Sequence, residues 1–193
     1  MTFILPLSLI IILLVAQIIK RSFLEKNLRK VFWIPILAIF SFSTILSVMQ
    51  YKAWQENELM RFALEAEGGI NGFLYNAFAN HFAPYVLSLL LALIFMFLMH
   101  RLNRRAEGRF FEKEEILIAF LSAFLSGFPG FLLFILGVLV AYLIAHIINK
   151  IIKRNAGSNV VPLYYFWLPV ASFVIITEMV WLSKLEFWSL LSI

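Results

Sequence analysis

Residues 108–131 read GRFFEKEEILIAFLSAFLSGFPGF, and the interpretation of the whole chain starts from this stretch. Its first part is a charged loop that ends in two adjacent carboxylates, Glu114 and Glu115. Its second part is a short apolar run that stops at a Gly-Phe-Pro-Gly corner, where glycine and proline favour a turn and end a helix. The stretch predicts a short apolar helix that is either a thin or tilted span or one half of a hairpin.

The composition of the 193-residue chain indicates a membrane protein. Hydrophobic residues make up 63% of it and the mean hydropathy is +0.93, which is more apolar surface than a soluble domain of this size can bury. The formal net charge of +5 does not indicate a nucleic-acid partner, because the basic residues lie in short loops beside apolar runs. Bilayer topology explains that placement, so the predicted partner is the lipid bilayer.

Two residue types are missing, and each absence excludes a class of chemistry. The chain has no cysteine, which excludes disulfides, thiolate metal sites and cysteine nucleophiles. All 11 acidic residues are glutamate, which excludes an aspartate dyad or an aspartate-held Mg²⁺ within this chain. The three histidines are far apart and show no metal-ligand spacing. We therefore expect no metal site and no cofactor.

Six apolar runs predict an all-α, polytopic membrane protein with about six transmembrane helices in a single membrane domain, residues 1–193. A spanning helix needs about 20 residues, and most of the runs approach that length. The runs are 3–19, 31–49, 84–99, 116–127, 131–148 and 162–182.

The basic residues predict the orientation of these helices. All but three of the lysines and arginines lie in alternate loops, which are 20–30, 100–115 and 149–161. The positive-inside rule places these loops in the cytoplasm and both termini outside. Because no basic residue precedes the first apolar run, we expect that run to be a retained helix and not a cleavable signal peptide.

The long connection 50–83 lies on the predicted outer side and contains two amphipathic patterns. Residues 50–67 are mixed and acidic, and residues 70–82 place apolar side chains at helical spacing. The opposite side of the second pattern carries polar residues, which are Asn71, Tyr75, Asn76 and Asn80. We expect an interfacial amphipathic segment that lies flat on the membrane. A lid over a cavity and a docking site for a partner are the alternatives.

The elements around the Gly-Phe-Pro-Gly corner follow an order that is found in a known family. A basic loop, a short helix ending at 127–130, a long apolar helix, a second basic loop and the segment Val161-Pro162-Leu163-Tyr164-Tyr165-Phe166 succeed one another. This order resembles the C-terminal half of type IV prepilin peptidases, bacterial membrane aspartyl proteases of the GxGD type. The resemblance covers residues 84–182 and, more weakly, the first basic loop. It implies a location in the bacterial cytoplasmic (inner) membrane.

This chain lacks the two aspartates that are the catalytic residues of that family. The GxGD aspartate falls on Glu115, or on Glu114 with a shift of one residue, and the first catalytic aspartate falls on Ile19 or a neighbour. Aspartyl proteolysis needs two carboxyl groups that share a proton across one water. The only acidic residue near the end of the first run is Glu25. The intact dyad is absent, so the resemblance implies a degenerate relative with no catalytic residues.

Three functions follow from these observations. The first is a non-catalytic, prepilin-peptidase-like scaffold that binds single-pass membrane helices in an assembly such as a pilus or secretion system, a link that the resemblance alone implies. The second is a transporter or channel subunit with Glu178, His146 and Gln17 as binding residues. The third is a membrane hydrolase in which Glu114 or Glu115 works with a second glutamate. The absence of aspartate and cysteine favours a protein that is not an enzyme.

Overall fold

The computed structural model describes residues 3–19, 27–28, 32–66, 68–107, 111–152 and 163–182. These residues form helices joined by turns, with no β-strand among them, which confirms the predicted all-α class. The helices are α1 (Ile4–Ile19), α3 (Trp33–Glu56), α4 (Glu58–Glu65), α5 (Gly69–Ala77), α6 (Ala83–Arg105), α7 (Lys113–Leu125), α8 (Gly130–Ile152) and α9 (Trp167–Val180). A π-helix, Phe78–Phe82, joins α5 to α6, and a 3₁₀ turn, Leu163–Tyr165, precedes α9.

Four helical stretches are long and apolar enough to cross a membrane, which indicates a multi-pass membrane protein. They are Trp33–Glu56, Gly69–Arg105, Gly130–Ile151 and Leu163–Val180. Helix α1 is apolar but has only 16 residues. Helix α7 has 13 residues, and at about 1.5 Å per residue it is about 20 Å long, less than the ~30 Å hydrocarbon core. The six predicted spans are therefore not confirmed: four stretches have the length and composition of a span, and α1 and α7 are shorter.

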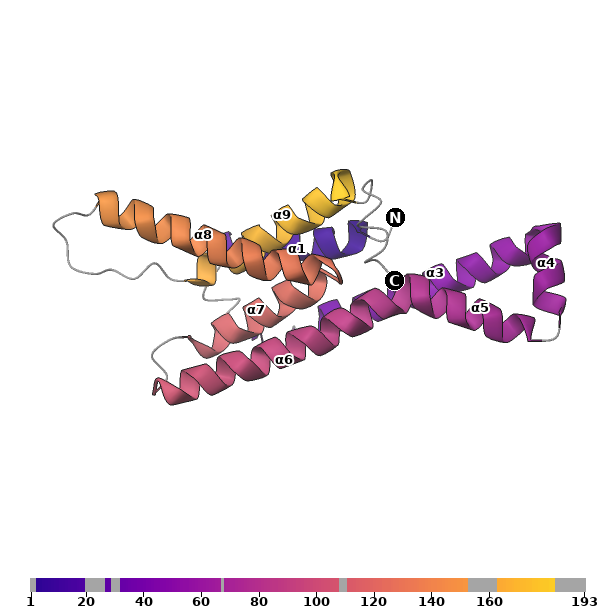
Figure 1. Cartoon of the computed structure of the whole chain (residues 1–193), viewed down its shortest axis with the longest axis horizontal. Coiled ribbons are helices and arrows are strands. Elements are labelled where there is room, and N and C mark those ends of the chain that lie inside the picture. The colour runs from indigo at the N-terminus through magenta and orange to yellow at the C-terminus, as the bar shows by residue number, and fades with distance from the viewer. Residues whose placement is uncertain are drawn as a thin grey trace.

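The short helix α7 lies at the centre of the molecule, where it packs against α6, α9, α1 and α8 (Figure 1). From Glu115 to Ser126 every side chain except that of Leu117 is buried. A helix that is apolar all round needs such enclosure. The rings of Phe120 and Phe124 extend the packing to the start of α3, which begins just after Phe32. The surrounding helices thus shield α7 from lipid.

The corner between α7 and α8 depends on glycine. Gly127 has a φ of +68°, in the left-handed region that glycine favours, and its N–H donates to the carbonyl oxygen of Phe124 over 3.1 Å. The next residue, Phe128, donates its N–H to the carbonyl oxygen of Pro84 on α6 over 3.3 Å. The corner is therefore fixed to α6, and α8 turns back from it as the predicted hairpin requires (Figure 1).

A helical hairpin projects from one end of the bundle (Figure 1). We call it the arm; it comprises residues 50–66 and 68–82 and contains the end of α3, all of α4 and α5, and the π-helix. Helix α4 starts at the tip because the Asn57 side chain caps it and accepts hydrogen bonds from the backbone nitrogens of Leu59 and Met60. The structure does not confirm a connector that lies flat over 50–83. That segment instead extends two long helices.

Three helices continue beyond their predicted C-terminal boundaries, whereas α7 and α9 end before theirs. Helix α3 continues to Glu56 beyond the predicted 31–49, and α6 continues to Arg105 beyond the predicted 84–99. Helix α8 likewise reaches Ile152, beyond 131–148. An apolar run ends at its first charged residues, whereas the backbone hydrogen bonds of a helix continue through them.

Candidate functional site

Two buried polar clusters lie at opposite ends of α9. The first, which we call the inner cluster, lies at the N-terminal end of α9 and contains Glu115, Trp167, Gln17 and Tyr164. Glu115, in the first turn of α7, is only 6% exposed. Its Oε1 accepts a hydrogen bond from the indole Nε1 of Trp167 over 3.3 Å. Its Oε2 accepts from the backbone nitrogen of Glu112 over 3.4 Å, as in a capping box. Glu115 therefore caps α7 and also connects it to α9.

Helix α1 contributes a carboxamide to the inner cluster. Gln17 is 5% exposed, and its Nε2 donates to the carbonyl oxygen of Tyr164 over 2.8 Å. Because Tyr164 lies in the 3₁₀ turn about one helical turn before Trp167, one short segment holds both Gln17 and Glu115. Ile19, where the resemblance places the first aspartate, is 70% exposed and does not face the cluster. Gln17 is the buried residue nearest that position on α1.

The inner cluster can hold helices together, but its described residues do not form a proton-sharing pair. A carboxamide has no ionisable proton, so Gln17 cannot replace a carboxyl group as an acid or base. Glu112 is exposed and Glu114 is half-buried. Both lie at the start of α7, where negative charge is favourable against the helix dipole. Glu25, the remaining glutamate considered for a dyad, lies outside the described residues.

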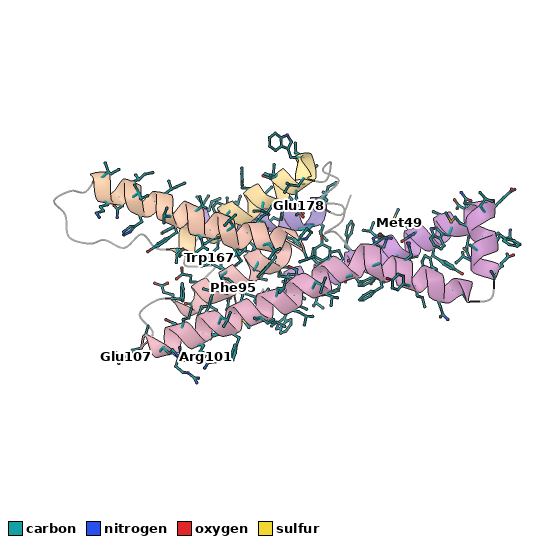
Figure 2. All side chains as sticks on the ribbon, in the orientation of Figure 1. Met49, Phe95, Arg101, Glu107, Trp167 and Glu178 are labelled. Atoms are coloured by element: carbon teal, nitrogen blue, oxygen red, sulfur yellow. The ribbon has the colours of Figure 1, made fainter. Side chains whose placement is uncertain are left out.

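The second cluster, which we call the deep cluster, surrounds Glu178 near the other end of α9 (Figure 2). It lies about 16 Å beyond Trp167 along the helix. Glu178 is 3% exposed, and its Oε2 would be only 2.6 Å from a Cβ added to Gly130. Tyr85 of α6 interacts electrostatically with this carboxylate. Glu178 therefore meets the start of α8, where the helix dipole favours a negative charge, and it requires a glycine there.

The structure does not bring together the three residues of the transporter hypothesis. Gln17 belongs to the inner cluster and Glu178 to the deep cluster. His146 is exposed on α8, where its ring stacks on Tyr142 with 6.2 Å between centroids. It lies about 24 Å along α8 from Gly130. These three side chains therefore do not line one common cavity.

A third polar cluster, which sequence reasoning missed, ties the two sides of the arm together. The Oδ1 of Asn76 accepts hydrogen bonds from Gln50 and from Asn80, each over 2.8 Å. The Oε1 of Gln50 lies 2.8 Å from Nε2 of His81. That oxygen can only accept, so Nε2 of His81 carries the proton. The sequence places Asn76 and Asn80 on the polar side of the second amphipathic pattern, but it does not indicate that Gln50 and His81 join them.

The partners of Glu115 and Gln17 carry no local sequence signal. Trp167 and Tyr164 lie about 50 and 150 residues from the side chains they bind in the chain, and only the folded structure brings them together. Among the described residues, no group of three or more histidines and glutamates could hold a metal ion.

No protein-family model, curated protein or solved structure matches this chain. The resemblance to prepilin peptidases therefore stays a prediction from motifs. The polar clusters and the arrangement of the helices are the observations that bear on function.

Proposed function

We propose that this chain is a non-catalytic scaffold in a membrane assembly, with a degenerate prepilin-peptidase-like architecture. The observation that carries the proposal is the bonding of the inner cluster. Glu115, at the position where the resemblance puts an aspartate, uses both carboxylate oxygens in hydrogen bonds, to Trp167 and to the Glu112 backbone. The residue that α1 contributes to the inner cluster is Gln17, whose side chain is a carboxamide. Such a site favours helix packing over hydrolysis.

We further propose that the chain crosses the bacterial cytoplasmic membrane six times with both termini outside. Support comes from the charged ends of two long helices. Arg104 and Arg105 end α6, and Lys150 lies in the last turn of α8. Both helix ends lie on the side of the molecule opposite to the arm (Figure 1). In this arrangement α7 crosses within the bundle, where neighbouring helices compensate for its short length. Helix α1 crosses at the edge of the bundle, with Ile12 and Ile18 exposed.

Helix α8 is the surface that we propose for single-pass partner helices. It packs mainly against α9, with a smaller contact to α7. Its other sides expose apolar side chains at helical spacing, among them Leu132, Leu136, Leu139 and Leu143. In a bilayer these side chains contact lipid or another membrane helix, and association between such helices depends on van der Waals packing.

Single-cysteine labelling tests the orientation without interference, because the chain has no cysteine of its own. We expect Glu58→Cys, at an exposed position at the tip of the arm, to react with a membrane-impermeant maleimide in intact cells. We expect Arg104→Cys to react only after the inner membrane is permeabilised. The opposite pattern would refute the proposed orientation.

The non-catalytic role is tested by complementation with Glu115→Gln. The amide keeps a carbonyl oxygen for the Trp167 indole but removes the charge and the acceptor for the Glu112 backbone N–H. Because a non-catalytic role needs no ionisable group there, we expect the variant to restore the phenotype of a gene deletion as well as wild type does. Loss of complementation at unchanged protein level would show that the carboxylate is needed for chemistry. Photo-crosslinkers at Leu139 should capture single-pass membrane helices in native membranes, and their failure to do so would refute the scaffold role.

A further inference from the structure

The arm exposes several apolar side chains next to a polar cluster that joins its two sides. Ile70, Leu74 and Phe78 are each more than half exposed, whereas Gln50 and Asn76 bond to each other across the hairpin. In water the exposed apolar surface would be unfavourable. In lipid the arrangement is favourable, because polar groups between helices hold them together and apolar side chains face the acyl chains. The arm is therefore built for contact with lipid.

The length of one continuous helix places the tip of the arm in the outer headgroup layer. From Arg101 to Ile70 the helical path is about 46 Å long, and its end-to-end length is shorter, because α5 and α6 run in different directions on either side of the π-helix (Figure 1). A bilayer with its headgroups is about 40–45 Å thick, so Ile70 lies among the outer headgroups when Arg101 lies at the inner ones. Tyr51 and Trp54 pack on Phe73 at this level, as aromatic residues do at a membrane interface.

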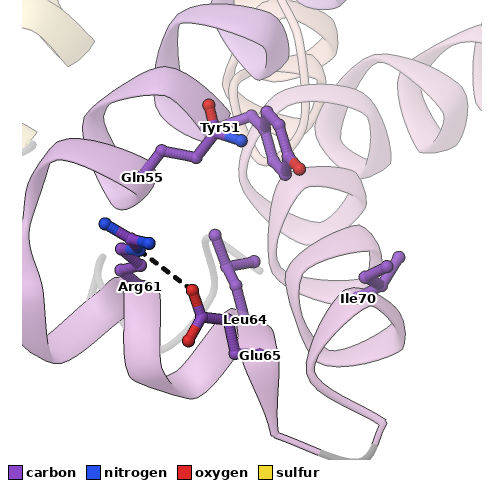
Figure 3. Close-up of a pocket in the computed structure, with 6 residues that line it drawn as sticks. All are labelled: Tyr51, Gln55, Arg61, Leu64, Glu65 and Ile70. Atoms are coloured by element: carbon purple, nitrogen blue, oxygen red, sulfur yellow. Dashed lines mark hydrogen bonds and ion pairs between the residues drawn. The ribbon is translucent and has the colours of Figure 1, made fainter.

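A recess of about 400 Å³ opens between α3, α4 and α5 at the same level (Figure 3). Its lining combines aromatic, apolar and charged side chains, which are Tyr51, Gln55, Arg61, Leu64, Glu65 and Ile70. Arg61 Nε donates to Glu65 Oε1 over 2.9 Å. Among the described residues nothing else bonds to these two side chains, so the terminal nitrogens of Arg61 and the other oxygen of Glu65 are open to a ligand.

The chemistry of the recess matches a group with a phosphate beside an ammonium. A guanidinium binds phosphate through paired N–H donors, and a carboxylate next to an aromatic face binds an ammonium. The described part of the arm has two basic residues, Lys52 and Arg61, against three acidic ones, Glu56, Glu58 and Glu65. This small excess of negative charge disfavours a purely anionic headgroup. Leu64 and Ile70 supply apolar contact for the adjoining glycerol.

We propose that the recess binds the phosphoethanolamine headgroup of an outer-leaflet phospholipid. The phosphate pairs with Arg61, the ammonium pairs with Glu65, and the acyl chains descend along the apolar side of α5. This inference goes beyond the scaffold role and uses only the membrane orientation proposed with it. A soluble phosphoethanolamine compound offers the same chemistry, and the experiment separates the two sources.

Native mass spectrometry of the full-length protein in detergent, titrated with defined lipids, tests the site. We expect phosphatidylethanolamine to bind at least about tenfold more tightly than phosphatidylglycerol with the same acyl chains, and Arg61→Gln/Glu65→Gln to weaken it about tenfold. The matched control is Lys52→Gln/Glu56→Gln, which removes the same two charges from another face of α3 and should bind as wild type does.

Wild-type affinity in a folded Arg61→Gln/Glu65→Gln protein, or equal binding of the two lipids by wild type, would overturn the proposal. Glycerophosphoethanolamine that binds as tightly as the lipid would assign the recess to a soluble ligand and overturn the lipid source. If the double variant does not fold, the lipid preference of wild type still decides the matter. Binding in detergent does not depend on orientation and cysteine labelling does not depend on the recess, so the two failures are distinguishable.

Discussion

The bundle around α7 and the arm use similar apolar side chains in opposite ways. In the bundle, Phe120 and Phe124 are at most 1% exposed and belong to a helix that packs against four neighbouring helices. In the arm, Phe62 and Leu74 point outward, and the contact between the two sides of the hairpin includes amides and an imidazole. This difference shows that apolar content alone does not locate the core of a membrane protein. What decides is whether protein or lipid fills the space beside each side chain.

Removing one aromatic ring from each region should give the largest difference in stability between the bundle and the arm. We expect Phe124→Ala to destabilise the protein by about 3 kcal/mol, because it leaves a cavity between packed helices. The matched change Phe62→Ala should cost less than about 0.5 kcal/mol, because that ring is 77% exposed. Thermal unfolding in detergent, followed by circular dichroism, measures both. Equal losses would mean that the arm is packed like the bundle.

Adding one methyl group should destabilise the protein in the bundle and stabilise it in the arm. At Gly130 a Cβ would meet the Glu178 carboxylate, so we expect Gly130→Ala to cost about 1–3 kcal/mol. At Gly72, in α5, nothing lies within 4 Å of an added Cβ. There we expect Gly72→Ala to stabilise by up to about 1 kcal/mol through helix propensity.

A double-mutant cycle with Glu178→Ala checks the cause at Gly130. If the clash is responsible, the Gly130→Ala penalty should largely disappear in the Glu178→Ala background. An unchanged penalty would place the strain elsewhere in the corner.

Two changes at Glu115 distinguish its hydrogen bonds from its charge. Glu115→Ala removes the acceptor for Trp167 and the contact to the Glu112 backbone, and we expect a loss of about 1–2 kcal/mol. Glu115→Gln should lose less than Glu115→Ala, because one oxygen remains. Glu114→Ala, at the half-buried neighbour, is the control and should stay within about 0.5 kcal/mol of wild type. The measurement is the same unfolding transition.

The polar cluster of the arm should give the smallest effect, and a local one. Gln50→Ala removes two interactions that join α3 to the π-helix region, and each is worth about 0.6 kcal/mol between membrane helices. We expect faster hydrogen exchange in α4 and α5 with little change in α7. Asn71→Ala, at an exposed position, is the control. Faster exchange spread evenly over α7 and the arm would show that the two regions are not independent.

The sequence predicts the helices of this fold better than it predicts their surroundings. Long apolar runs locate α3, α6 and α8, because a continuous apolar surface is a local property. Residues 70–82 are helical, as their apolar spacing predicts. The spacing does not predict which apolar side chains are buried, because Phe73 and Ala77 pack inside the arm while Ile70, Leu74 and Phe78 are exposed.

The same limit applies to the candidate site residues. Gln17, Glu115 and Glu178 are buried, as polar residues beside apolar runs suggest, whereas His146 is exposed. Their partners cannot be predicted, because Trp167 and Gly130 contact them from other helices. Such pairings between distant residues need the three-dimensional structure.

The enclosure of α7 has a consequence for how the protein is made. A helix about 20 Å long cannot by itself satisfy the thickness of a bilayer, and its first turn carries a buried carboxylate. During synthesis, transfer of α7 by itself from the insertion machinery into lipid is therefore unfavourable. Its most extensive contact is with α6, where Ser88 donates to the carbonyl oxygen of Phe124. This packing favours entry of α6 and α7 as a pair, with the enclosure of α7 completed when α9 arrives.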